Sequence, residues 1–311
     1  EISECLVGSE MCIRDRTKII EGMKLMLWGM FMKVVLADRI AIYANTVLDN
    51  YEYQNGISCF IASFCYTIQI YGDFAGYSLL AIGCGKIMGF DLPNNFNRPY
   101  FAATITEFWR RWHISLTQWL TSYVYIPLGG NRCSKARCYM NIFITFLISG
   151  LWHGANWTFI FWGWLHGMFQ VIEKITGLNS TPKNKWEKIF RISLTFLIIN
   201  FAWIAFRMPT ISDTFAIYNK IFTNFNGTLF LPGDKTTIVF IMFALLLLLF
   251  KEITDEYFPD SFKIMNSNYT VVRWIGYVSM IVIIMLLGVF DAGQFLSLIH
   301  ISEPTRHSLI S

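Results

Sequence analysis

Apolar segments of nearly bilayer-crossing length recur along this chain of 311 residues. A helix needs about 20 mostly apolar residues to cross a bilayer. Hydrophobic residues make up 54% of the chain and charged residues 15%, which is too apolar for a soluble globule. The candidate crossings lie at residues 57–71, 139–151, 157–175, 189–206, 237–250 and 271–290. The pattern predicts an all-α, polytopic membrane protein that contacts the lipid bilayer and crosses it about six or seven times.

Residues 19–48 are also apolar but carry charged residues, which predicts a long helix whose charged end reaches an interface. The net charge of +4 is small and spread over several segments. This distribution argues against a nucleic-acid partner. Cys133 and Cys138 have no second cysteine pair or nearby histidine, so we expect no metal site.

The two ends of the chain differ in character from the rest. Residues 5–16 (CLVGSEMCIRDR) and 297–306 (SLIHISEPTR) resemble translated sequencing-adaptor read-through. We therefore expect residues 1–16 and 297–311 to be artefacts and residues 17–296 to form the domain. The histidines that remain in the domain are His113, His153 and His166.

His153 and His166 lie in a stretch, residues 149–167, that is otherwise apolar. A titratable ring at membrane depth costs several kcal/mol unless it is paired or faces water, so it is a candidate for function. In one straight helix the two rings would lie roughly 20 Å apart on nearly opposite faces. Gly154 and Asn156 can break the helix after His153 and leave that ring near a cavity. We expect His166 to be a packing or interfacial residue.

Asp73 lies between Gly72 and Gly76 at predicted membrane depth. Two glycines four residues apart permit either close helix contact or a break in the helix. The carboxylate then needs a partner or water. We favour a structural role for Asp73 over a catalytic one.

Residues 104–122 carry apolar side chains at helical spacing on one face, which predicts a single amphipathic helix at the interface. Thr104 and Glu107 form a capping-box pattern, and Glu107 and Arg111 an i,i+4 pair. His113 lies at the edge of the apolar face, where it is either functional or simply bonded to a neighbour. Arg110 and Arg111 could hold an anionic ligand, although a solvated or headgroup-facing pair is favoured.

Several motifs in sequence order resemble the membrane-bound O-acyltransferase family, in particular its bacterial branch with alginate and peptidoglycan O-acetyltransferases. The motifs are Tyr-Gly-Asp-Phe-Ala-Gly-Tyr-Ser at 71–78, Leu-Pro-Asn-Asn-Phe-Asn-Arg-Pro-Tyr at 92–100, Glu-Phe-Trp-Arg-Arg-Trp-His-Ile-Ser-Leu at 107–116, Tyr-Ile-Pro-Leu-Gly-Gly-Asn-Arg at 125–132 and Gly-Leu-Trp-His-Gly-Ala-Asn-Trp at 150–157. The resemblance implies a helical ring around a central tunnel, with interfacial amphipathic helices. It also implies further spans before the start of this chain.

In the family, the histidine of the Trp-His-Gly motif is catalytic, which implies this role for His153. The histidine of the Phe-Trp-Arg-Arg-Trp-His motif is a second functional residue, here His113. Candidates for contact with substrate or tunnel are Trp152, Asn156, Trp157, Asp73, Arg110 and Arg111.

The reaction implied by the resemblance is acetyl transfer from acetyl-CoA, or another acyl donor, with His153 as general base. The donor is a substrate, and no bound cofactor is expected. The acceptor would be an extracytoplasmic polysaccharide of the cell envelope, or a partner acetyltransferase, served from the bacterial inner membrane. The alternatives are D-alanyl transfer to teichoic acid within the same family, a membrane transporter or channel, and a non-catalytic scaffold.

Overall fold

The computed structural model describes residues 2–231, 234–259 and 264–290, with side chains from Arg16 onward. These residues form helices and connecting turns, with no strand among them, which confirms the all-α prediction. The C-terminal segment expected to be an artefact lies outside the described residues. The α-helices are α1 (Ile2–Met30), α2 (Asp38–Leu48), α3 (Gly56–Ile87), α4 (Ile105–Arg111), α5 (Ile114–Leu120), α6 (Lys135–His153), α7 (Trp157–Thr176), α8 (Lys185–Arg207), α9 (Ile211–Thr223), α10 (Lys235–Tyr257) and α11 (Thr270–Leu287). Two π-helices (Phe31–Ala37, Thr121–Tyr125) and three 3₁₀ turns (Tyr51–Tyr53, Pro99–Phe101, Ile264–Asn266) complete the described structure.

Three helices of the described chain, α8, α10 and α11, are long and apolar enough to cross a membrane. They correspond to the crossings predicted at residues 189–206, 237–250 and 271–290. The crossings predicted at 57–71, 139–151 and 157–175 fall in α3, α6 and α7, which are helices of 32, 19 and 20 residues but are less apolar than these three.

The chain divides into two compact units. The described parts of Glu1–Ile42, Ile68–Asn95 and Pro232–Val289 form the first unit, and Tyr43–Thr67 and Phe96–Leu231 form most of the second. Each of the helices α2 and α3 has one end in the first unit and its other end in the second.

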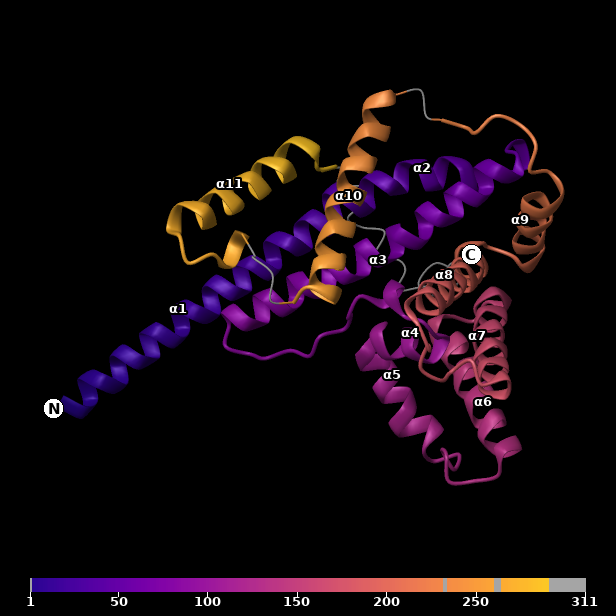
Figure 1. Cartoon of the computed structure of the whole chain (residues 1–311), viewed down its shortest axis with the longest axis horizontal. Helices are drawn as coiled ribbons and strands as arrows, with labels where there is room; N and C mark the ends of the chain where they lie inside the picture. Colours follow the sequence, from indigo (N-terminus) through magenta and orange to yellow (C-terminus); the bar gives the residue numbers. More distant parts are fainter. Residues whose placement is uncertain (1, 232–233, 260–263, 291–311) are drawn as a thin grey trace, which may run out of the picture. The chain divides into compact units, whose positions relative to one another are not determined.

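In the first unit, α1 and α3 pack against each other in antiparallel directions (Figure 1). A Cβ atom at Gly76 would lie 2.8 Å from the Gly29 carbonyl oxygen, and one at Gly83 would lie 2.5 Å from that of Gly22. Only residues without side chains allow the two backbones to come this close. The glycines near Asp73 therefore serve close helix contact. The alternative prediction of a helix break there is wrong, because α3 continues from Gly56 to Ile87.

The helix predicted over residues 19–48 contains a π-helix at Phe31–Ala37. At its end, the Asp38 backbone N–H donates to the Lys33 carbonyl, five residues earlier. The same wide turn brings the Asp38 carboxylate to 2.8 Å from the Lys33 ammonium. Sequence periodicity does not distinguish this seven-residue π-helix from the α-helices on either side of it, because π-helices occur as short insertions within longer helices.

The second unit contains a helical hairpin of α6 and α7, with α8 packed against α7 (Figure 1). A polar network in its interior joins α3 to α8. The fully buried Asn200 accepts a hydrogen bond from the Thr67 hydroxyl (2.7 Å) and donates to the Ser63 hydroxyl (3.1 Å). Buried polar groups must be paired, so these bonds fix how α8 sits on this end of α3.

The amphipathic helix predicted over residues 104–122 is interrupted. Helix α4 ends at Arg111, His113 adopts a left-handed conformation with φ of +43°, and α5 begins at Ile114. The start of the segment is as predicted, because Thr104 accepts a hydrogen bond from the Glu107 N–H (2.9 Å). The Glu107–Arg111 ion pair also forms, at 2.7 Å.

We predict that Gly76→Val will lower the free energy of unfolding by about 1–3 kcal/mol, the usual cost of overpacking a tight contact. The added atoms would overlap the α1 backbone at the Gly29 carbonyl. The matched control is Ala81→Val, which adds volume to the same helix at an exposed position. Thermal unfolding in detergent measures both, and equal stability of the two variants would contradict the close α1–α3 contact.

Candidate functional site

His153 is the last residue of α6, directly before a sharp turn into α7. Gly154 follows with φ of +155°, and a Cβ atom there would lie 2.8 Å from the Phe159 ring. Asn156 caps α7, with its side-chain oxygen accepting from the Thr158 N–H (3.1 Å). The predicted break after His153 is confirmed, and the imidazole lies at a helix end.

Aromatic rings surround the His153 imidazole. The ring centroids of Trp152, Phe206 and Trp162 lie 5.0, 5.1 and 5.3 Å from its own, each in an edge-to-face arrangement. Phe159 lies at 6.3 Å. Edge-to-face contacts with several rings restrict the rotation of the imidazole and thereby orient its two nitrogens.

His113 lies in the same unit, close to His153. Its ring is 6.3 Å from that of Trp152, which also contacts the His153 ring at 5.0 Å. Burial lowers the pKa of His113 to about 4, so its imidazole is neutral at pH 7. The structure thus brings together the histidines of two motifs that are 40 residues apart in sequence.

His166 is fully buried, as expected of a packing residue, but it also makes a polar contact. Its Nδ1 accepts a hydrogen bond from the Trp109 indole N–H at 3.3 Å. The Trp162 ring lies 4.9 Å from His166 and 5.3 Å from His153. A single indole therefore touches the two histidines that a straight helix would have placed on opposite faces.

The candidates Trp152, Trp157 and Asn156 differ in their exposure and in what their side chains contact. Trp152 is 55% exposed and contacts both His113 and His153, so it belongs to the site. Trp157 is 72% exposed. The Asn156 side chain is used by the backbone, because besides capping α7 it donates to the Pro209 carbonyl at 3.0 Å.

The two arginines also differ from each other. Arg110 is exposed at the end of α4, which fits a solvated or headgroup-facing residue. Arg111 is engaged, because it pairs with Glu107 and donates to the Arg98 carbonyl at 3.4 Å. Neither arrangement identifies an anionic ligand.

Asp73 belongs to the first unit, whereas His113 and His153 belong to the second. Its carboxylate lies 2.5 Å from the buried Lys33 ammonium, which also contacts Asp38. One lysine therefore holds two carboxylates inside this unit. The arrangement fits the structural role favoured from the sequence.

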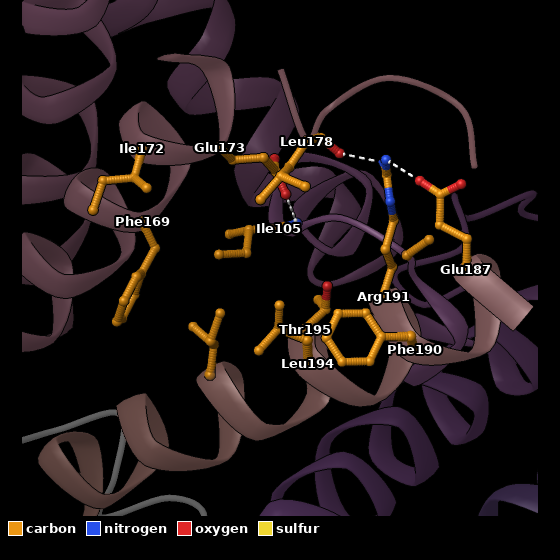
Figure 2. Close-up of a pocket in the computed structure, with 12 residues that line it drawn as sticks. Ile105, Phe169, Ile172, Glu173, Leu178, Glu187, Phe190, Arg191, Leu194 and Thr195 are labelled. Atoms are coloured by element: carbon orange, nitrogen blue, oxygen red, sulfur yellow. Dashed lines mark hydrogen bonds and ion pairs between the residues drawn. The ribbon is translucent and has the colours of Figure 1, made fainter. Parts of the chain in front are cut away.

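A pocket of about 240 Å³ lies between α7, α8 and the start of α4 (Figure 2). Its walls are mostly apolar, and its charged groups are engaged. Arg191 donates to the Leu178 and Ser180 carbonyls and pairs with Glu187, and Glu173 accepts from the Ile105 N–H (2.7 Å). Glu173 was not identified from the sequence, although a carboxylate within the apolar stretch 157–175 is a signal of a buried polar contact.

The fold and the site define a helical membrane protein with two histidines at an aromatic cluster. Residues 22–210, more than half of the chain, match the membrane-bound O-acyltransferase family. The chain belongs to this family.

Curated relatives agree with this assignment. The chain is 44% identical over 206 residues to the probable alginate O-acetylase AlgI of Pseudomonas syringae pv. tomato, covering 66% of this chain and 39% of the relative. It is 42% identical over 191 residues to the peptidoglycan O-acetyltransferase of Helicobacter pylori, covering 61% and 36%. It is 32% identical over 178 residues to the teichoic acid D-alanyltransferase of Bacillus subtilis, covering 53% and 43%. The chain thus spans about two fifths of the length of the curated relatives it matches.

We predict that Asp73→Asn will destabilise the protein by about 1–3 kcal/mol, because Lys33 loses one charged partner but keeps Asp38. Lys33→Met should cost more, about 3–5 kcal/mol, since it leaves two carboxylates buried without their cation. Thermal stability of the purified variants measures this order. Equal losses of stability in the two variants would contradict a structural role of Lys33 between the two carboxylates.

Proposed function

We propose that this protein is an O-acyltransferase of the bacterial inner membrane that transfers acetyl groups for O-acetylation of an extracytoplasmic polysaccharide. The observation that carries the proposal is the meeting of His113 and His153 at the Trp152 ring. Acyl transfer to a hydroxyl needs a base at the reacting oxygen, and imidazole is the side chain best suited to this near neutral pH.

In the proposed reaction, a nitrogen of His153 accepts the proton of the acceptor hydroxyl as its oxygen attacks the thioester carbonyl of acetyl-CoA. The carbon–sulfur bond then breaks, and the His153 imidazolium returns the proton to the departing thiolate. The products are an O-acetyl ester and free coenzyme A. Acetyl-CoA is a substrate, and the chemistry needs no resident cofactor. General-base catalysis of this kind contributes roughly 10²- to 10⁴-fold.

His113 is proposed to hold a substrate oxygen beside His153. A neutral imidazole has one N–H donor and one acceptor nitrogen, so it can donate to a carbonyl oxygen while His153 serves as base. Trp152, in contact with both rings and half exposed, would form the wall against which the substrate lies.

The acceptor is proposed to be an envelope polysaccharide, reached directly or through a partner acetyltransferase. Support comes from the relatives named for alginate or peptidoglycan O-acetylation, which are 41–44% identical to this chain. The teichoic acid D-alanyltransferases are 32% identical, so D-alanyl transfer is the second candidate.

We predict that His153→Ala in the full-length gene will reduce ester-linked acetyl on envelope polysaccharide by at least about 10²-fold, because the base is removed. The measurement is acetate released by mild alkali from polysaccharide of cells that express either form. Trp186→Phe, an exposed substitution at the start of α8, serves as the control that should match the parent.

The amount of each protein in the membrane is measured alongside. Equal ester with His153→Ala and with the parent, at equal protein levels, would refute the role of His153. Ester-linked D-alanine in place of acetate would favour the second candidate.

A further inference from the structure

Helix α7 holds α4 at two points. The first is the hydrogen bond from the Trp109 indole N–H to His166 Nδ1, at 3.3 Å. The second is the Glu173 carboxylate, which accepts from the Ile105 N–H at 2.7 Å and from the Thr106 N–H and hydroxyl at 3.1 and 2.8 Å. Figure 2 shows the bond from Ile105 to Glu173 at the edge of the pocket. We call this pair of contacts the α4 clamp.

The two α7 residues of the α4 clamp lie on one face of their helix. His166 and Glu173 are seven residues apart, which is nearly two helical turns. Their partners, Trp109 and Ile105, are four residues apart, which is about one turn of α4. Two contacts at separate positions fix both the rotation of α4 and its position along α7, which one contact could not do.

Both contacts are buried, so their geometry is strongly enforced. His166 is 0% exposed, and Trp109 and Glu173 are 7% exposed. A buried polar group that loses its partner destabilises the fold, and does so more strongly when it is charged. The negative charge of Glu173 is also well placed at the N-terminus of α4, where the peptide dipoles favour an anion.

The position of α4 determines that of His113, which follows the last α4 residue, Arg111, by two positions. The same α7 carries Trp162, whose ring contacts His153 at 5.3 Å. Helix α7 therefore contacts both the His153 ring and the helix that precedes His113.

We propose that His166 and Glu173 are positioning residues that hold His113 in place beside His153 through the α4 clamp. The proposal rests on the proposed acyltransferase function. Neither residue needs to touch substrate, because each acts through a group of α4. Misplacement of a reacting group by about 1 Å is enough to slow an enzymatic reaction roughly 10²-fold.

The atoms of His166 can be tested separately. Because Nδ1 accepts a hydrogen bond from Trp109, the ring proton is on Nε2. Asparagine offers an acceptor oxygen close to the place of Nδ1, whereas glutamine extends its amide towards the place of Nε2. His166→Asn should therefore preserve the bond to Trp109, and His166→Gln should lose it.

The experiment compares kcat and KM for acetyl-CoA in membranes that carry the full-length protein. His166→Gln and Glu173→Gln are expected to lower kcat by about tenfold to 10²-fold with KM nearly unchanged, while His166→Asn stays within about threefold of the parent. Trp109→Phe should lower kcat as His166→Gln does, and the double variant should be no slower than either, because both remove one interaction. Ile175→Ala, at an exposed position of α7, is the matched control and should retain parental kinetics.

Equal losses in His166→Asn and His166→Gln, or additive losses in the double variant, would overturn the positioning role. The positioning role would also be overturned if the losses of kcat only followed a loss of folded protein, which the thermal unfolding of each variant reveals. A parent without acetyl transfer would refute the proposed function instead. The α4 clamp is then tested by the modification of His113 with diethyl pyrocarbonate, which should be faster in His166→Gln than in His166→Asn, and equal rates would overturn it.

Discussion

The close contact between α6 and α7 determines where His153 lies. A Cβ atom at Gly150 or Gly163 would come within 2.3 Å of a backbone carbonyl of the facing helix. Two helices can approach this closely only where both lack side chains at the contact. Because the hairpin is so tight, the turn between its helices is short, and His153 is fixed opposite the first turns of α7. Trp162, on the second turn, then reaches both His153 and His166.

Several polar side chains of the interior are paired with a group of another helix. The pairs include Lys33 with Asp73 in the first unit and Thr67 with Asn200 in the second. In an apolar surrounding, an unpaired polar group is costly, so the pair excludes other ways of packing the same helices. Apolar contacts alone would tolerate sliding of one helix along another, because one aliphatic surface resembles the next. These few polar contacts therefore give the helices their unique arrangement.

The sequence predicts those features that depend on neighbouring residues. The helical class follows from hydropathy, the start of α4 from the capping box at Thr104, and the end of α6 from Gly154. The pairing of Lys33 with Asp73 escapes such reasoning, because the two partners are 40 residues apart and belong to different helices. The same distinction applies to the candidate histidine site. The family resemblance singles out His113 and His153, but their shared contact with Trp152 is visible only in three dimensions.

The break at His113 illustrates how a local cost produces a functional arrangement. Among the described residues, Arg98 and His113 are the two non-glycine residues with positive φ, and they lie before and after α4. Such a conformation costs about 1–2 kcal/mol for a residue with a side chain. The contacts that hold α4 offset this cost, including the bond from the Asn97 N–H to the Arg111 carbonyl at 2.9 Å. In an unbroken helix His113 would continue the spiral of α4 along its amphipathic surface. Because His113 is left-handed, helix α4 does not continue through it. Its imidazole contacts Trp152 of the Trp-His-Gly motif instead.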